Sequence, residues 1–383
     1  MSTTHPAGFR ASGVTAGLKA SGASDVALLV NDGPDHHAAA VFTGNRVEAA
    51  PVTWSRQVVA DGRADAVVLN SGGANACTGA QGFTDTHRTA EHVAGVLEVS
   101  AGDVVVCSTG LIGELLPMDK LLPGVDAAAA ALTGDGGPDA ARAIMTTDSV
   151  PKTAVAQRDG WSVGGMAKGA GMLAPALATM LVVVTTDAVT TPEQLDAALR
   201  EATRTTFDRI DSDGCMSTND AVVALSSGAS GVTPAPDELT EALREVCGEL
   251  ARALIGDAEG AAHDIAVTVR RAATEEDGLE VARAVTRSNL LKCAIFGQDP
   301  NWGRVLSAVG TTAATFDPRD LDVSINDVMV CRESGVGEDR DLVSLAEREV
   351  RIDIDLKSGE EEVTVWTNDL THDYVHENSA YST

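Results

Sequence analysis

The chain has 383 residues and a formal net charge of −28 at pH 7, with 28 Lys and Arg against 56 Asp and Glu. This excess of acid repels phosphate backbones and anionic lipid, which argues against nucleic acids and membrane surfaces as partners. Aromatic residues make up only 3 % of the chain, which argues against base stacking and predicts a core of Ala, Val, Leu and Ile. A chain of this length predicts two domains or one large layered α/β unit.

The cysteines and the N-terminal residues carry no sign of a zinc site or a secreted protein. The six cysteines are widely spaced and contain no C-x-x-C pair, so we expect reduced thiols. The N-terminus lacks a charged segment followed by an apolar core, and no stretch has the ~18 apolar residues that a membrane helix needs. We therefore expect a cytoplasmic protein.

Short apolar runs alternate with helical patterns in the first half of the chain. The predicted strands cover residues 26–30, 38–42, 66–70 and 104–107. Helical patterns cover residues 87–99, the region 111–132 with its two interrupting prolines, and 139–145. The alternation predicts an α/β fold.

The second half continues this alternation and contains one well-marked helix start. Thr191 is a capping residue, Pro192 takes the first helical position, and Glu193 adds acid to the first turn. Further predicted elements are strand 221–225, helix 236–255, strand 265–269 and helix 278–287. In segments 350–356 and 362–367 apolar and polar residues alternate. A Lys-Ser-Gly turn lies between the two segments, which predicts a β-hairpin.

Residues 164–184 carry the clearest chemical signal. They read GGMAKGAGMLAPALATMLVVV, so that glycines, Lys168 and Pro175 precede Thr179, and an apolar run follows it. The pattern predicts a sharp loop that delivers Thr179 to the first position of a buried strand. A dinucleotide fingerprint needs a helix after its glycines, and a P-loop needs a hydroxyl residue directly after its lysine, so neither fits. The remaining alternative is that Thr179 is an ordinary β-branched residue that opens a strand.

Two further segments are candidates for chemistry. Residues 107–113 (CSTGLIG) follow a strand and lead toward a helix, so their backbone N–H groups are expected to converge near the helix start, where an oxyanion binds. A structural glycine turn is the alternative. The loop from residue 207 resembles an EF-hand, but Arg209 stands at the first ligand position and Asp220 at the last. We predict a hydrogen-bonded acidic loop there rather than a calcium site.

No histidine base accompanies these hydroxyl residues. The eight histidines form no H-E-x-x-H, and no metal site or Ser-His-Asp set can be assembled from the sequence. A hydroxyl nucleophile without a histidine needs another base, and an N-terminal threonine uses its own α-amine. Thr179 has that amine only if the chain is cut before it.

Together these motifs resemble the ornithine acetyltransferase (glutamate N-acetyltransferase) family of arginine biosynthesis, nearly from end to end. The matching segments are 8–14 (GFRASGV), 41–46 (VFTGNR), 70–79 (NSGGANACTG), 108–110 (STG), 168–172 (KGAGM), 178–181 (ATML) and 294–304 (AIFGQDPNWGR). Gly73 departs from the family pattern, in which Asn is common, and Ala176-Leu177 stands where many relatives carry Asn-Met. The resemblance implies a layered α/β sandwich similar to N-terminal-nucleophile hydrolases.

The resemblance also implies an activity. It is the transfer of the acetyl group of N2-acetylornithine to glutamate, by a ping-pong mechanism through an acetyl-threonine, with no metal and no cofactor. Self-cleavage between Ala178 and Thr179 would give an α chain of residues 1–178 and a β chain of residues 179–383. Two α and two β chains are expected to assemble, and the other partners are small-molecule substrates.

Individual roles follow from the motif matches. Thr109 and Gly110 correspond to the oxyanion hole, and Thr179 to the nucleophile. The substrate-binding positions, besides Thr179, are Thr147 (or its neighbour Thr146), Lys168, Glu259, Asn378 and Thr383. Lys168 suits a substrate carboxylate and Glu259 a substrate amino group.

Two enzymatic alternatives stay open. One is a bifunctional enzyme that also uses acetyl-CoA to acetylate glutamate. The other is a hydrolase of the β-peptidyl aminopeptidase type, which passes the acyl group to water but is expected to have serine where Thr179 stands. A non-catalytic binding protein, in contrast, would leave the chain uncut.

Overall fold

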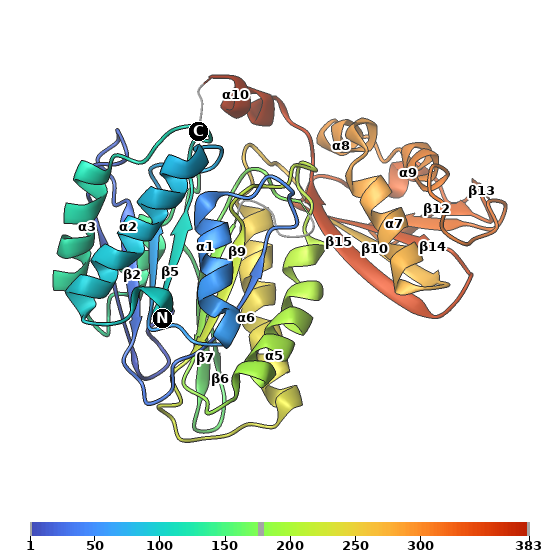
Figure 1. Ribbon diagram of the computed structural model, residues 1–383. Helices are drawn as coiled ribbons and strands as arrows, with labels where there is room; N and C mark the ends of the chain where they lie inside the picture. The colour runs from blue at the N-terminus through green and yellow to red at the C-terminus, as the bar shows by residue number, and fades with distance from the viewer. Residues whose placement is uncertain (1, 175–179, 381–383) are drawn as a thin grey trace. The chain divides into compact units, whose positions relative to one another are not determined.

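The computed structural model describes residues 2–174 and 180–380 (Figure 1). They divide into two compact units, each with its own hydrophobic core. The first unit contains the residues up to Asp208 and the segment Cys215–Asp257, and the second contains Arg209–Gly214 and the residues from Ala258 onward.

The first unit contains two sheets. One has the strand order β1-β2-β4-β5 and the other the order β3-β9-β8-β7-β6. The strands are β1 (Phe9–Val14), β2 (Val26–Asn31), β3 (His37–Phe42), β4 (Ala66–Asn70), β5 (Val104–Ser108), β6 (Lys152–Gln157), β7 (Ser162–Lys168), β8 (Leu181–Thr186) and β9 (Ala221–Ser226). The helices are α1 (Ala50–Val58), α2 (Gly79–Leu97), α3 (Met118–Ala130), α4 (Gly137–Ala143), α5 (Pro192–Arg204) and α6 (Pro236–Gly256).

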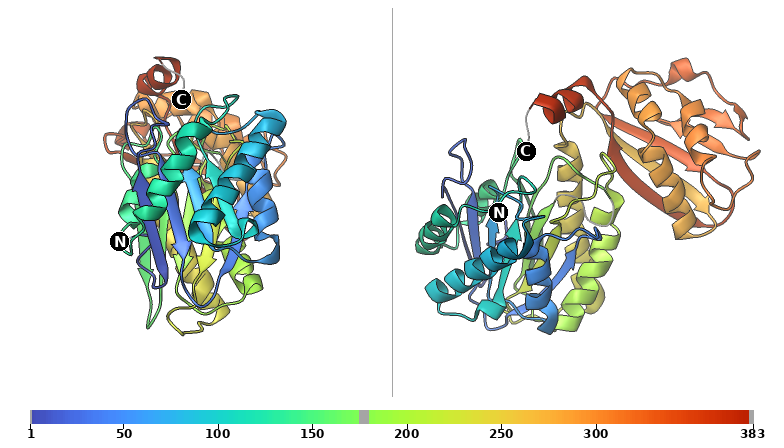
Figure 2. Two further views of the ribbon diagram at one scale, coloured as in Figure 1. Left: turned by 60° about the vertical axis from the view of Figure 1, so that its left-hand side comes forward. Right: turned by 45° about the horizontal axis from the view of Figure 1, so that its top comes forward.

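These two sheets share one core and are covered by helices on their outer faces. Leu29 and Leu69 of one sheet and Val183 and Val223 of the other are buried in the same cluster. Helices α2 and α3 pack on the outer face of the first sheet, and α5 and α6 on that of the second (Figures 1 and 2). Because both faces of the inner strands are covered, these strands are continuous apolar runs rather than alternating ones. The predicted layered α/β sandwich is confirmed in this unit.

The second unit is built on one six-stranded sheet, with the order β13-β12-β11-β14-β10-β15. Helices α7, α8 and α9 pack on one of its faces. The strands are β10 (Asp264–Ala272), β11 (Asp322–Ile325), β12 (Val328–Arg332), β13 (Gly335–Val336), β14 (Glu349–Asp355) and β15 (Glu361–Asn368). The helices are α7 (Glu275–Thr286), α8 (Asn289–Phe296), α9 (Trp302–Val309) and α10 (His372–Ala380).

The hairpin predicted for residues 350–367 is wrong. Strands β14 and β15 do not pair, because β10 lies between them, parallel to β14 and antiparallel to β15. Apolar and polar residues alternate in any strand that has one buried and one exposed face. The pattern therefore identified two strands but not the strands with which they pair. The predicted turn instead crosses the end of β10, where the N–H groups of Ser358 and Gly359 both donate to the carbonyl oxygen of Arg271.

The predicted helix start before α5 is confirmed. The Thr191 hydroxyl accepts from the Gln194 N–H at 3.3 Å, and the Gln194 side chain accepts from the Thr191 N–H at 3.2 Å, which is a complete capping box. The predicted helical region 111–132 is shorter in the structure, since α3 begins only at Met118 and Pro123 lies inside it. Among the residues that the structure describes, no helix has the length and apolarity to cross a bilayer.

Candidate functional site

The stretch that carries Thr179 begins in a strand, not in a loop as predicted. Strand β7 pairs antiparallel with β8, so that Lys168 lies opposite Leu181. Gly164 and Gly165 lie within β7, and a Cβ atom would be 2.2 Å from a backbone oxygen at Gly164 and 2.8 Å from a helix side chain at Gly165. These glycines therefore permit close packing rather than a turn. The predicted cleavage site Ala178, the nucleophile Thr179 and the substrate-binding Thr383 lie outside the described residues.

Lys168 and Thr109 meet at the ends of strands from the two sheets of the first unit. Their exposed fractions are 1 % and 3 %, and Lys168 Nζ donates a hydrogen bond to Thr109 Oγ1 at 3.3 Å. The Thr109 N–H donates to the Asn70 carbonyl at 2.9 Å, so this N–H group is not available to a ligand. Since the hydroxyl oxygen accepts from Lys168, the hydroxyl hydrogen is the donor that Thr109 can offer to a ligand.

Gly110 is held against the turn that follows β4. Its φ of +131° is a conformation that favours glycine, and a Cβ atom would lie 2.7 Å from the Gly73 nitrogen. The Gly73 N–H donates to the Thr109 carbonyl at 3.0 Å, which ties the two turns together. Within the described part of the chain the Gly110 N–H donates no hydrogen bond. Thr109 and Gly110 thus supply one hydroxyl and one amide as neighbouring donors.

The expected helix terminus beside these donors is absent. Residues 107–113 were predicted to lead toward a helix with their N–H groups near its start, but α3 begins only at Met118, and the residues between are not helical. The donors therefore come from two hydrogen-bonded turns. Glycine turns and helix-initiating turns look alike in the sequence, because both join a strand to a polar or glycine-rich segment.

Asp148 connects the predicted substrate-binding positions of the first unit. Its carboxylate accepts hydrogen bonds from the Gly169 N–H at 2.6 Å and the Thr146 N–H at 2.9 Å. Gly169 directly follows Lys168, and Thr146 directly precedes the half-buried Thr147. One buried side chain therefore holds in place the two backbone segments that carry Lys168 and Thr147.

Buried lysines keep this carboxylate charged. Lys152 Nζ donates to Asp148 at 2.6 Å and to Asp257 at 2.6 Å, and the Lys152 side chain is 1 % exposed. Burial alone would raise the pKa of Asp148, but the positive charges of Lys168 and Lys152 and the Gly169 N–H together lower it to about 2. Neither Asp148 nor Lys152 was identified from the sequence, since nothing but tertiary burial distinguishes them from other charged residues.

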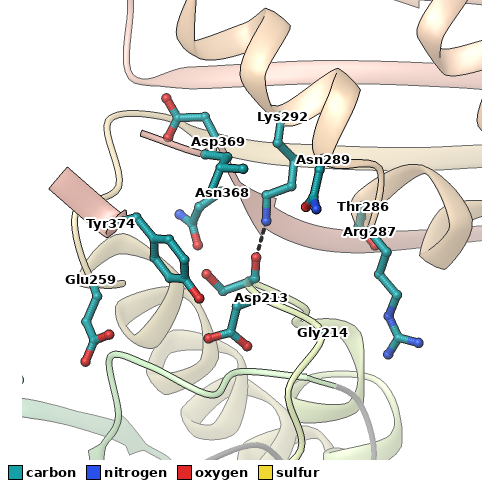
Figure 3. Close-up of a pocket in the computed structure, with 12 residues that line it drawn as sticks. Asp213, Gly214, Glu259, Thr286, Arg287, Asn289, Lys292, Asn368, Asp369 and Tyr374 are labelled. Carbon is teal, nitrogen blue, oxygen red and sulfur yellow. Dashed lines mark hydrogen bonds between the residues drawn. The ribbon is translucent and has the colours of Figure 1, made fainter. Parts of the chain in front are cut away.

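The second unit brings together two further predicted residues, Glu259 and Asn378. Asn378 Nδ2 donates to Glu259 Oε2 at 3.0 Å. Glu259 also lines a cavity of about 220 Å³, whose lining includes Asp213, Lys292 and Tyr374 (Figure 3). Lys292 donates to the carbonyl oxygen of Ser212. Sequence reasoning missed Lys292, for which a lysine inside the apolar segment NLLKCAIF was the available signal.

The acidic side chains of the segment that resembles an EF-hand do not converge on one position. Asp211 accepts from the Gly214 N–H at 3.0 Å and from Arg287 Nε at 2.7 Å. Asp220 instead accepts from the Met180 N–H at 3.0 Å. Among the described residues, no group of three or more His, Cys, Asp or Glu side chains is arranged to hold a metal ion. None of the six cysteines, all of which lie in the described ranges, forms a disulfide bond.

Comparison with known proteins places the whole chain among close relatives. A family model described as the ArgJ family matches residues 10–383. A protein from Streptomyces coelicolor named arginine biosynthesis bifunctional protein ArgJ is 65 % identical over 382 residues, with 100 % of each chain covered. A protein of the same name from Thermobifida fusca is 62 % identical over 383 residues, again with 100 % of each chain covered.

One solved structure is similar to part of the chain. The crystal structure of the arginine biosynthesis bifunctional protein from Bacillus halodurans is 34 % identical, with a TM-score of 0.50. The match covers 52 % of this chain and 98 % of that chain.

Proposed function

The chain belongs to the ArgJ family, and from this premise we propose that it transfers the acetyl group of N2-acetylornithine to glutamate, releasing ornithine and N-acetylglutamate. Family membership confirms the resemblance seen in the motifs and the expectation of an acetyltransferase of arginine biosynthesis. The observation that carries the proposal is 65 % identity over the whole length to a protein named for arginine biosynthesis.

The proposed reaction begins with a cut between Ala178 and Thr179, which gives Thr179 a free α-amine. Such an amine has a pKa of about 7.7–8.0, so near pH 7 a useful fraction is unprotonated and can take the proton of the Thr179 hydroxyl. The hydroxyl oxygen then attacks the acetyl carbonyl of N2-acetylornithine. The Thr109 hydroxyl and the Gly110 N–H donate hydrogen bonds to the resulting oxyanion.

Collapse of this intermediate breaks the bond between the acetyl carbon and the ornithine nitrogen, which takes the proton from the α-ammonium. Ornithine leaves, and Thr179 carries the acetyl group as an ester. The amino group of glutamate then attacks the same carbonyl carbon, with the same base and the same oxyanion donors. Release of N-acetylglutamate restores the Thr179 hydroxyl.

The remaining predicted positions are proposed to bind the amino-acid substrates. The buried charge of Lys168 beside Thr109 supports its role as the partner of a substrate carboxylate, with Thr147 nearby in the Asp148 network. Glu259, oriented by Asn378, is proposed to bind an amino group together with Thr383. We further propose a cytoplasmic assembly of two α and two β chains.

Labelling with the donor alone tests the central step. The enzyme is incubated with N2-acetylornithine without glutamate, quenched in acid and weighed by mass spectrometry. One added acetyl group is expected on the peptide that begins at Thr179, and glutamate added before the quench should remove it. An unlabelled β chain with intersecting initial-rate lines would mean direct transfer in a ternary complex. Continuous release of ornithine without glutamate would indicate the hydrolase instead.

A second activity is favoured by one specific observation, namely that the relatives are named bifunctional proteins. We propose acetyl-CoA as a second acetyl donor for glutamate, at a rate below that of N2-acetylornithine. The lower rate is expected because this acidic chain has no recognisable glycine-rich phosphate loop for the CoA diphosphate. Initial rates with each donor at saturation test the point, and comparable turnover would contradict the ranking.

A further inference from the structure

Lys292 is a buried cation that lines the cavity of the second unit. It lies on helix α8, its exposed fraction is 6 %, and its ammonium group points toward the segment that carries Asp213 (Figure 3). All the residues that line the cavity belong to the second unit. The cavity volume of about 220 Å³ is roughly that of seven water molecules, so the cavity has room for a small organic ligand.

The hydrogen-bond partners of Lys292 Nζ are neutral oxygens. This nitrogen donates to the Ser212 carbonyl, the dashed line in Figure 3, and to Thr367 Oγ1 at 3.4 Å. Within the described part of the chain, no carboxylate oxygen lies within 4.0 Å of Lys292 Nζ. Lys152, in contrast, is a buried lysine that contacts two carboxylates at 2.6 Å. A buried charge without a counter-ion is costly, so Lys292 suits an anionic ligand.

The carboxylates around Lys292 are bound to other groups. Asp211 accepts from Arg287 Nε at 2.7 Å, and Asp369 accepts from the His263 N–H at 2.9 Å and lies 2.7 Å from His263 Nδ1. Burial lowers the pKa of Lys292, and the negative charges around it raise this pKa by less. A carboxylate in direct contact would stabilise the charged form of the lysine.

A side chain of the opposite charge lines the same cavity. Glu259, which Asn378 Nδ2 contacts at 3.0 Å, lies on the side of the cavity where Tyr374 stands (Figure 3). The side chain of N2-acetylornithine ends in an ammonium group, and that of glutamate ends in a carboxylate. A ping-pong enzyme receives both amino acids in turn, so its binding site needs a partner for each charge. The cavity offers both.

We propose that Lys292 binds the side-chain carboxylate of glutamate in this cavity and is thereby a specificity-determining residue for the acetyl acceptor. The inference rests on the proposed function. An ammonium group has three N–H donors, and the hydrogen bonds to Ser212 and Thr367 use two of them. The third is the donor that the carboxylate receives.

Lys292→Met tests the proposal, because it removes the charge and keeps an unbranched side chain of similar length. Glutamate and glutamine are compared as acetyl acceptors by their kcat/KM, since glutamine has nearly the same shape but no side-chain charge. We expect the preference for glutamate over glutamine to fall about 10–100-fold in the variant, because a charged hydrogen bond is lost. An unchanged preference overturns the proposal.

A purely structural role for Lys292 gives a different result. Loss of the hydrogen bond to Ser212 would lower the melting temperature and slow the reaction with both acceptors equally, so their ratio would not move. Lys357→Met is the matched control, because Lys357 lies in the same unit but pairs with Asp320 at 2.6 Å and Asp322 at 3.0 Å and does not line the cavity. Its preference should equal that of the wild type. An equal fall in both variants would trace the effect to net charge and overturn the proposal.

A measurement on the unmodified protein does not depend on how the variants fold. Reductive methylation followed by mass spectrometry of the peptide that contains Lys292 gives the rate at which this amine reacts. Glutarate, which has the carboxylate but no amine that consumes the reagent, should slow the methylation of Lys292 and not that of Lys357. Equal rates with and without glutarate overturn the proposal. Failure of the wild-type enzyme to accept acetyl from N2-acetylornithine would instead refute the proposed function.

Discussion

Lys168 Nζ donates a hydrogen bond to Thr109 Oγ1 at 3.3 Å, which joins the last residue of β7 to the residue that follows β5. Both side chains are buried. A hydroxyl group that accepts from an ammonium group is a stronger donor through its own hydrogen, since hydrogen bonds in a chain polarise one another. The pair therefore strengthens Thr109 as a donor to negative charge.

Removing this hydroxyl should slow both half-reactions. We expect Thr109→Ala to lower the rate of acetyl labelling by about 10²–10³-fold, and the rate of acetyl removal by glutamate by a similar factor, because one oxyanion donor is lost. Rapid quench followed by mass spectrometry of the β chain measures both rates. Thr109→Ser keeps the hydroxyl and should restore much of the activity. Unchanged rates in Thr109→Ala would remove this residue from the oxyanion hole.

A side chain at Gly110 should separate the two turns that form the donor site. The Cβ atom of Gly110→Ala would meet backbone atoms of Gly73 at 2.7 and 2.9 Å, so one turn must shift. We expect loss of most acetyl transfer and a lower melting temperature. Gly113→Ala is the matched control, because Gly113 also has a positive φ, of +88°, but its Cβ would meet nothing within 4 Å. Equal losses in both variants would trace the effect to backbone strain rather than to the contact.

The buried Asp148–Lys152 pair should contribute strongly to stability. Asp148→Asn leaves the buried Lys152 with Asp257 as its remaining carboxylate, and breaking a buried pair typically costs about 3–5 kcal/mol. Urea denaturation of the uncut or cut protein measures the change. Asp32→Asn, which breaks the exposed pair with Arg10, should cost no more than about 1 kcal/mol. Similar costs for the two variants would contradict the structural role of Asp148.

Asp148 should also make the stability of the fold depend on pH. Asp148 has a folded-state pKa of about 2, below its ordinary value of 3.8, so its carboxylate stabilises the fold at higher pH. That contribution should decline as the pH falls from near 3.8 toward 2, where the folded protein also takes up the proton. The free energy of unfolding of Asp148→Asn should fall less steeply over this interval than that of the wild type. Parallel curves would mean that Asp148 does not supply this part of the acid sensitivity.

The strands that are buried on both faces could be predicted from the sequence. Strands such as β4 and β5 are covered on both faces, so they appear in the sequence as uninterrupted apolar runs, and their predicted ends agree with the structure to within one residue. Strand β7 was missed because its glycines resemble a turn, although Gly164 leaves space for the backbone of Ser2. Strand partners were not predictable either, since β10 lies between two strands that adjoin in the sequence.

The candidate site was predictable only through its motifs. Thr109, Gly110 and Lys168 lie in short segments of unusual composition, and the structure brings them together. Asp148 is a single carboxylate in a chain with 56 Asp and Glu residues, so nothing local sets it apart. Its importance depends on burial and on hydrogen bonds to residues far away in the sequence, which only the folded chain reveals.

The proposed cut would divide one sheet between two chains. Strands β3, β6 and β7 would belong to the α chain, and β8 and β9 to the β chain. In the sheet order β3-β9-β8-β7-β6, two boundaries are then shared between the chains. Each of these boundaries is a ladder of antiparallel pairs, from Lys168 opposite Leu181 in one and from Phe42 opposite Ala221 in the other.

We therefore expect the two chains to remain together after cleavage. A denaturing gel should show two bands of similar size, whereas size-exclusion chromatography under native conditions should show one species that contains both. Separating the chains would expose the edges of buried strands and the shared core of the sandwich, which is strongly unfavourable. Thr179→Ala should give one uncut, inactive band, because the attack of the Thr179 hydroxyl on the Ala178 carbonyl begins the cut. Normal processing of this variant, or native separation of the chains, would contradict the assignment.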